Sequence, residues 1–268
     1  MYVDSHCHLS FPGLHERVDD ILEAMAAAQV SRALCVCTTL EEFPRVHALA
    51  IAHDNLWATA GVHPDNEGVA EPTLADLVER ARLPRVLAIG ETGLDYYRLN
   101  GRSVDDMAWQ RARFRVHIEA ARASGLPLVI HTRNAGEDTL SMLRAHGGGA
   151  ALRGVFHCFT ESLDVAREAV AMGFHVSFSG ILTFGNAQAL REVARWVPLE
   201  RCLIETDSPY LAPVPYRGKT NSPAYVPHVA KRLADVKGLA LEEVARATTA
   251  NFEALFGVPA LAVTAASA

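Results

Sequence analysis

The chain has 268 residues, of which 50% are hydrophobic and 21% are charged, so it can bury a sizeable core and is not globally disordered. Its formal net charge is −6, which argues against a sequence-independent binder of duplex DNA, because such proteins are normally strongly basic; a small cationic cleft is not excluded. The length suits either two ordinary domains or one α/β barrel of roughly 250 residues.

The sequence predicts neither a membrane span nor a secretory leader. No apolar run approaches the roughly 20 residues that cross a bilayer, and the opening MYVDSHCHL lacks a basic start and an apolar segment. Five cysteines in such a chain predict free thiols and a cytoplasmic protein. Cys35 and Cys37 lie in an apolar run, so we expect buried strand residues rather than a metal or redox pair.

Short β-rich runs alternate with longer stretches of helical spacing. The eight predicted strands are Tyr2–Asp4, Ala33–Cys37, Trp57–Gly61, Val86–Ile89, Leu128–Ile130, Gly154–Phe156, His175–Ser177 and Cys202–Ile204. The clearest predicted helices are Val18–Ala28, Asp106–Ser124, Leu163–Met172, Pro223–Val236 and Leu241–Phe256.

Strands that alternate with helices predict parallel pairing and right-handed crossovers. Eight such units predict an α/β fold, a single (β/α)8 TIM barrel over residues 1–258, with a flexible tail at 259–268. An open doubly wound sheet would instead place a glycine-rich phosphate turn after the first strand, where this chain has His-Cys-His-Leu.

The active site of such a barrel lies where the strands end. Imidazole or carboxylate side chains follow six of the eight predicted strands: His6 and His8, His63, Glu91, His131, His157 and Asp207. The other two strands are followed by the hydroxyl side chains of Thr38 and Ser179. Any one of these residues could be a polar strand end, but packing alone does not explain the set, and barrel closure would gather it around one axis.

Four imidazoles and two carboxylates exceed one tetrahedral zinc site and suit two ions about 3.5–4 Å apart. Strand residues two positions apart point the same way, so His6 and His8 would chelate. The predicted arrangement has one ion on His6, His8 and Asp207, the other on His131 and His157, and Glu91 bridging them. Imidazole-rich ligation favours Zn²⁺ or Mn²⁺ over a site for Mg²⁺ alone.

Two assignments stay open on the residues alone. Glu205 lies two positions before Asp207 on the same face but deeper, so we assign Asp207 to the metal and Glu205 to a supporting role, with the reverse as the alternative. His63, in Gly-Val-His-Pro, is either a phosphate or substrate contact or a structural residue.

The motifs D-S-H-C-H-L, G-V-H-P, I-G-E-T-G-L-D-Y-Y, L-P-L-V-I-H-T-R, F-H-C-F and E-T-D-S-P-Y-L, in this order, resemble the TatD family of metal-dependent nucleases in the amidohydrolase superfamily. The resemblance runs from about residue 2 to residue 257. It implies a (β/α)8 barrel and a phosphodiesterase that uses divalent metal ions. The ligands it implies are the six already chosen, and it adds substrate-facing roles for His63, Asp95, Tyr96 and Arg133.

The chain departs from that family in two stretches. Gly185 stands where many relatives have a lysine, and Thr220 and Ser222 replace a basic and an acidic residue of the loop after the eighth strand. Both stretches are expected near the mouth of the barrel, so the departures bear on substrate preference more than on the metal chemistry.

The leading hypothesis is a two-metal hydrolase (Zn, Mn or Mg) that cleaves phosphodiester bonds of DNA, single-stranded and from an end, as a monomer. Glu91 and Asp207 are its predicted catalytic residues, with Asp207 helping to deprotonate the attacking water. His63 and Arg133 would stabilise charge at phosphorus, and Tyr96 would stack on a base.

Two alternatives remain. A hydrolase of the same superfamily could act on an ester, a lactone or an aminoacyl-tRNA. Many such relatives bridge their metals with a modified lysine, whereas this chain has Glu91 at that strand end. A catalytically silent, metal-stabilised binding protein is the other alternative, and the complete ligand set argues against it.

Overall fold

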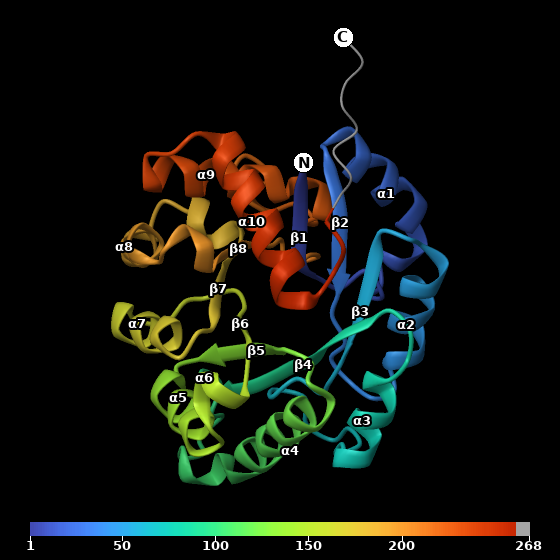
Figure 1. Ribbon diagram of the computed structural model, residues 1–268, viewed down its shortest axis with the longest axis vertical. Coiled ribbons are helices and arrows are strands. Elements are labelled where there is room, and N and C mark those ends of the chain that lie inside the picture. The colour runs from blue at the N-terminus through green and yellow to red at the C-terminus, as the bar shows by residue number, and fades with distance from the viewer. Residues whose placement is uncertain (261–268) are drawn as a thin grey trace.

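All strands of the described residues form one parallel sheet, ordered as they follow in the sequence (Figure 1). The computed structural model describes residues 1–260. The strands are β1 (Tyr2–Cys7), β2 (Val30–Cys35), β3 (Leu56–Ala60), β4 (Val86–Asp95), β5 (Leu128–Arg133), β6 (Gly154–Phe156), β7 (His175–Phe178) and β8 (Cys202–Ile204).

Main-chain contacts between β1 and the segment after β8 join the two edges of the sheet. The Asp207 amide donates to the His6 carbonyl at 2.9 Å, and the His8 amide donates to the Ser208 carbonyl at 2.9 Å. Cys7 and Ser208 form a parallel bridge between these hydrogen bonds. The predicted (β/α)8 barrel is therefore confirmed, and its closure brings Asp207 beside His6 and His8.

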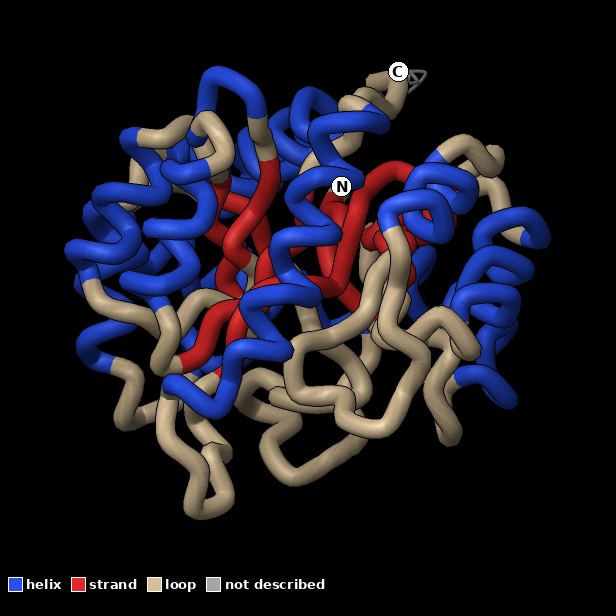
Figure 2. Tube along the Cα trace, turned by 90° about the horizontal axis from the view of Figure 1, so that it is seen from below, coloured by secondary structure: helices blue, strands red, loops and turns tan. Residues whose placement is uncertain are grey.

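Helices surround the strands, and long loops gather at one end of the barrel (Figure 2). The helices are α1 (Val18–Ala27), α2 (Phe43–Ala52), α3 (Leu74–Ala81), α4 (Ala108–Ser124), α5 (Gly136–Ala145), α6 (Gly148–Ala151), α7 (Leu163–Ala171), α8 (Gln188–Trp196), α9 (Val226–Lys237) and α10 (Leu241–Phe256). Short 3-10 turns are η1 (His15–Arg17), η2 (Asp105–Met107), η3 (Gly180–Thr183), η4 (Leu199–Arg201) and η5 (Pro223–Tyr225).

The core lies mainly between the strands and this layer of helices. A second cluster joins Val3, Leu34 and Val129 of the strands to Phe252 and Phe256 of α10. These side chains are at most 4% exposed, so α10 is fixed against the barrel by apolar burial.

Three predicted strands end too early, because polar residues continue them. Glu91 lies inside β4, His6 inside β1 and His131 inside β5, rather than just after those strands. Their polarity predicts that the strands end before these residues, but in this barrel the strand pairing extends past the apolar run. The side chains are therefore placed on sheet backbone, which holds them more rigidly than loops would.

Gly93 allows β4 to approach β5 closely beside one of these residues. It pairs with His131, and a Cβ built on it would lie 1.9 Å from the His131 carbonyl oxygen. Its φ of +127° also lies in the region that side chains disfavour. A glycine is thus required where the two strands that carry Glu91 and His131 meet.

Among the described residues, no helix has the length and apolar character to cross a membrane. All five cysteines are free, and Cys35 and Cys37 are fully buried, as their apolar surroundings predict. Of the tail predicted at 259–268, residues 261–268 lie outside the described residues.

Candidate metal centre

The two carboxylate oxygens of Glu91 face two different groups of side chains. Oε2 lies 3.3 Å from Nε2 of His6 and 3.8 Å from Nε2 of His8. Oε1 lies 2.8 Å from Nε2 of His157 and 3.3 Å from Nδ1 of His131. A carboxylate in the middle of two nitrogen groups has the geometry of a bridge.

Hydrogen bonds orient the rings of three of these histidines. His8 donates Nδ1–H to the Val36 carbonyl at 3.0 Å, because a carbonyl oxygen only accepts. His131 donates Nε2–H to Asp95 at 3.0 Å, and His157 donates Nδ1–H to Glu205 at 3.2 Å.

The other ring nitrogen of each neutral imidazole is then unprotonated, and it is the one that faces Glu91 or Asp207. Metal-binding histidines typically have such a partner on the far nitrogen, which orients the ring and raises its basicity. In their neutral form the three rings can therefore give a lone pair to a cation, and metal binding would displace any proton that they carry there. His6 contributes Nε2 as well, while its Nδ1 has no hydrogen-bond partner.

His63 differs from these three histidines because the ring nitrogen that faces Glu91 carries the proton. The Asp65 amide donates to its Nδ1 at 3.0 Å, so Nδ1 must accept and the ring proton sits on Nε2. That nitrogen lies 3.2 Å from Oε1 of Glu91. His63, Glu91 and His131 are close enough to hold an ion, but His63 presents an N–H rather than a lone pair. The Nε2–H of His63 is therefore a hydrogen-bond donor.

Asp207 and Glu205 occupy different levels of the site. Asp207 Oδ1 lies 3.4 Å from His8 and 3.7 Å from His6, and its side chain is 16% exposed to the pocket. Glu205 is fully buried and accepts from the Cys158 amide at 2.7 Å as well as from His157. Asp207 also has a φ of +56°, a strained conformation of the kind that concentrates at functional sites.

The side-chain charges act on one another strongly. Burial would raise the pKa of Glu91, but the neighbouring His157, His63 and His6 hold it well below its ordinary value. Burial would likewise lower the pKa of His157, and Glu91 and Glu205 raise it instead well above the ordinary value. The carboxylates thus stay ionised, which is the state that binds a cation.

The donors fit a divalent metal centre. His6, His8 and Asp207 can place their ligand atoms within 4.8 Å of one another, as can His63, Glu91 and His131. Nε2 of His157 is buried without a hydrogen-bond partner, although it faces Glu91. Buried imidazole and carboxylate donors with unused lone pairs are the ligands that Zn²⁺ and Mn²⁺ accept.

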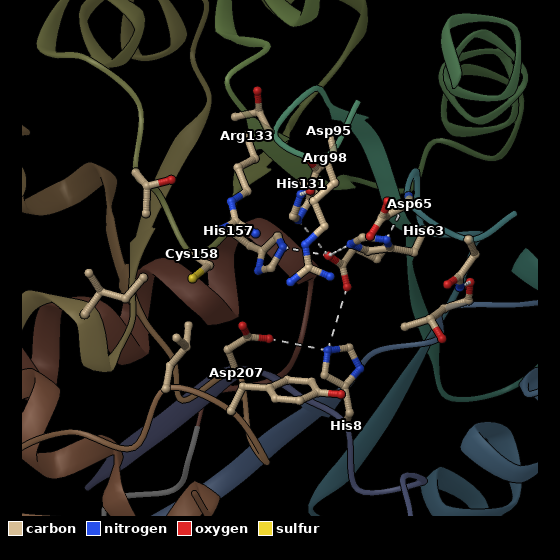
Figure 3. A pocket seen from close by; sticks show the side chains of 18 of the residues that line it. His8, His63, Asp65, Asp95, Arg98, His131, Arg133, His157, Cys158 and Asp207 are labelled. Atoms are coloured by element: carbon tan, nitrogen blue, oxygen red, sulfur yellow. Dashed lines mark hydrogen bonds and ion pairs between the residues drawn. The ribbon is translucent and has the colours of Figure 1, made fainter. Parts of the chain in front are cut away.

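The cluster opens into a pocket of about 590 Å³ at the carboxyl ends of the strands (Figure 3). Of the residues that the sequence singled out for substrate, His63, Asp95 and Arg133 line it. Both Asp95 oxygens are already used, by His131 and by the Tyr97 amide at 2.8 Å. Asp95 therefore orients His131 rather than facing substrate freely.

Tyr96 is not among the residues that line the pocket, which corrects its expected role in base stacking. Its side chain is buried, and its hydroxyl donates to Asp138 at 2.8 Å and accepts from Arg111 at 3.0 Å. The exposed neighbour is Tyr97. Sequence reasoning missed Phe11, Arg98 and Tyr210, which do line the pocket. They lie on loops, where no periodicity predicts the direction of a side chain.

The three departures from the family pattern do not form the pocket wall. Gly185, Thr220 and Ser222 are absent from its lining residues, although they were expected near the mouth. The Ser222 hydroxyl accepts from the Ala224 amide and so caps the turn η5. Between Thr220 and Ser222, the buried Asn221 donates to the Thr206 and Tyr210 carbonyls at 2.8 and 2.6 Å, so this loop adjoins the pocket through its backbone contacts.

Comparisons with known proteins identify the family of this chain. The model of the TatD-related DNase family matches residues 3–257. The chain is 46% identical over 262 residues to YcfH of Escherichia coli K12, named an uncharacterized metal-dependent hydrolase, and the match covers 96% of both chains. It is 34% identical over 251 residues to the 3′-5′ ssDNA/RNA exonuclease TatD of Citrobacter rodentium, covering 90% of this chain and 92% of that one.

Among solved structures, YjjV of Escherichia coli K12, a TatD homologue, superposes with a TM-score of 0.88 at 29% identity and covers 96% of this chain and 98% of its own. An organophosphorus hydrolase from Deinococcus radiodurans superposes with a TM-score of 0.63 at 16% identity, over 96% and 92% of the two chains. The second likeness shows a shared fold only.

Proposed function

This chain belongs to the TatD family of metal-dependent hydrolases, and from that premise we propose that it cleaves phosphodiester bonds of single-stranded DNA from an end, with two divalent metal ions. The observation that carries the proposal is Glu91, whose two oxygens face two separate groups of imidazoles. The printed activity of the Citrobacter relative supports a nucleic-acid substrate.

In this proposal His6, His8 and Asp207 would hold one ion, His131 and His157 would hold the other, and Glu91 would offer an oxygen to each. Zn²⁺, Mn²⁺ or Mg²⁺ would activate water and neutralise charge on the phosphate. Asp207 is exposed to the pocket and ionised, so it accepts the proton of the attacking water. The Nε2–H of His63 donates to a phosphoryl oxygen as negative charge develops there.

The net charge of −6 restricts the substrate. Affinity for duplex backbone rises with the number of phosphates that cations neutralise, and within residues 1–260 only two arginines, Arg98 and Arg133, line this pocket. A strand end that enters a pocket needs few such contacts. The exposed aromatic ring of Tyr210 in the wall can stack on an unpaired base. We propose a cytoplasmic monomer, in keeping with the free cysteines.

The test uses metal-loaded protein and single-stranded oligonucleotides labelled at the 5′ or the 3′ end. We expect products that shorten stepwise from one end, and no cleavage by Glu91→Gln. Parallel assays with an ester, a lactone and an aminoacyl-tRNA test chemistry at a carbonyl centre. Turnover of those substrates with intact oligonucleotides would overturn the proposal.

A further inference from the structure

Arg98 is a cation in the pocket wall that has no counter-ion among the described residues. It follows β4 by three positions and its side chain points into the pocket (Figure 3). Neighbouring arginines of the same region are paired, Arg102 with Glu67 at 2.7 Å and Arg111 with Asp138 at 3.9 Å. Arg98 forms no hydrogen bond or ion pair within residues 1–260, so its five N–H donors are available to a ligand.

The loop that carries Arg98 is anchored on both sides. Before it, the Tyr97 amide donates to Asp95 at 2.8 Å. After it, Arg102 donates to the Leu99 carbonyl at 3.0 Å and reaches across to Glu67. Because the backbone is held, less conformational entropy is lost when the side chain binds.

Arg133 supplies a second guanidinium from the adjacent strand. Its Cζ lies 3.6 Å from the centre of the Tyr97 ring, which holds the side chain at the pocket wall. In Figure 3 the two arginines come from the same side of the pocket, opposite His8 and Asp207. β4 and β5 thus present a pair of cations next to the cluster around Glu91.

The charges of the pocket leave a place for more than one phosphate. Its lining carboxylates are those of Asp65, Glu91, Asp95 and Asp207. Two divalent cations would balance these four negative charges. The two guanidinium groups then remain uncompensated, whereas the single phosphodiester that is cleaved brings one negative charge.

We propose that Arg98, together with Arg133, binds a second phosphate of the substrate, next to the one that is cleaved. The proposal rests on the phosphodiesterase function proposed above and deepens it. The enzyme then acts on chains of two or more phosphodiester-linked nucleotides in preference to a simple phosphate ester. Arginine suits this task because its planar fork matches two phosphate oxygens.

A neutral linkage in the substrate tests the contact directly. In single-stranded oligonucleotides, one methylphosphonate replaces the second linkage from the 5′ end or the second linkage from the 3′ end, next to a terminal linkage that can be cleaved. For wild-type protein we expect one of these isomers to raise KM about tenfold, the size of a lost hydrogen bond to a charged group. Arg98→Ala should raise KM about tenfold on the all-phosphate strand and lose much less than wild-type protein when that methylphosphonate is introduced, because only the contact with Arg133 is then left to lose.

The matched control is Arg153→Ala, which removes the same charge from an exposed residue that precedes β6 and does not line the pocket. It should cleave with the wild-type KM. Arg98→Lys keeps the charge and should recover part of the loss. An Arg98→Ala protein with wild-type KM, or one that loses a further tenfold with the methylphosphonate, would overturn the proposal.

Binding without turnover separates this inference from the proposed function. Fluorescence polarisation of the same labelled strand, with Ca²⁺ in place of the activating metal, gives affinity against salt. The plot of the logarithm of affinity against the logarithm of salt concentration should be shallower by about 0.7 in Arg98→Ala, because one phosphate contact is lost. If wild-type protein cleaves strands but the slope is unchanged in the variant, only the Arg98 contact fails. If no strand is cleaved or bound, both proposals fail.

Discussion

Nδ1 of His157 donates to the buried carboxylate of Glu205 across 3.2 Å. The opposite nitrogen of the same ring lies 2.8 Å from Glu91, so Glu205 determines which nitrogen His157 offers to a metal. The contact joins the residue that follows β6 to the segment after β8, two parts of the chain 48 positions apart.

Glu205→Gln should weaken metal binding without removing a proposed ligand. Glutamine is isosteric, but it carries no charge and can turn its NH2 group toward His157 Nδ1, so the ring is oriented less firmly. We expect metal affinity to fall about 10–100-fold, with activity restored by excess metal. Metal titration followed by calorimetry measures this. Glu192→Gln, an exposed residue on α8, is the control, and an unchanged affinity in Glu205→Gln would count against the role of Glu205.

His63→Gln should separate chemistry from metal binding. Because Nδ1 of His63 accepts from the Asp65 amide, its Nε2 carries a proton and is a donor. We expect kcat to fall about 10²-fold, as when a donor to a developing oxyanion is removed, while the metal content is retained. His131→Gln, by contrast, should lose metal. Elemental analysis measures the metal content of the two variants. Loss of metal from His63→Gln would show that His63 is a ligand.

Gly93→Ala should destabilise the barrel at the contact between β4 and β5. The new Cβ would meet the His131 carbonyl oxygen at 1.9 Å. Backbone must shift to relieve this, and φ is unfavourable as well, so we expect a loss of about 3 kcal/mol or more in the free energy of unfolding. Gly185→Ala is the control, since a Cβ there meets nothing within 4 Å. Equal melting temperatures for the two variants would refute the argument.

The buried, neutral His117 should make the metal-free protein less stable in mild acid, because only the unfolded chain can protonate this residue readily. Burial lowers the pKa of His117 from about 6.5 to about 4, and its Nε2 accepts from the Val62 amide at 2.9 Å. The unfolded chain therefore binds the proton more readily, so this contribution is present above pH 6.5 and is lost as the pH falls toward 4. The difference between the two pKa values corresponds to a loss of about 2 kcal/mol in the free energy of unfolding between pH 7 and pH 5.

Urea unfolding of wild-type protein and His117→Gln at both pH values tests this. Glutamine retains an acceptor for the Val62 amide but does not titrate, so the variant should lose about 2 kcal/mol less than wild type over that interval. An identical pH dependence in both proteins would contradict the assignment. Because the two proteins share every other titrating group, the difference isolates His117.

The barrel and the convergence of the cluster were predictable from the sequence, whereas the surroundings of the cluster were not. Parallel strands end at one face, so His6, Glu91 and Asp207 could be expected together from their positions alone. Tyr96 and Tyr97 are adjacent, and the sequence of a loop does not indicate which of them is buried and which is exposed. The tautomer of His63 depends on a hydrogen bond from Asp65, which only the folded backbone provides.

The central claim is that two metal ions lie on either side of Glu91. Anomalous-scattering maps of crystals grown with Zn²⁺ or Mn²⁺ test it most directly. We predict two peaks about 3.5–4 Å apart, one near His6, His8 and Asp207 and one near His131 and His157, with a Glu91 oxygen at each. A single peak, or none near His131 and His157, would contradict the claim.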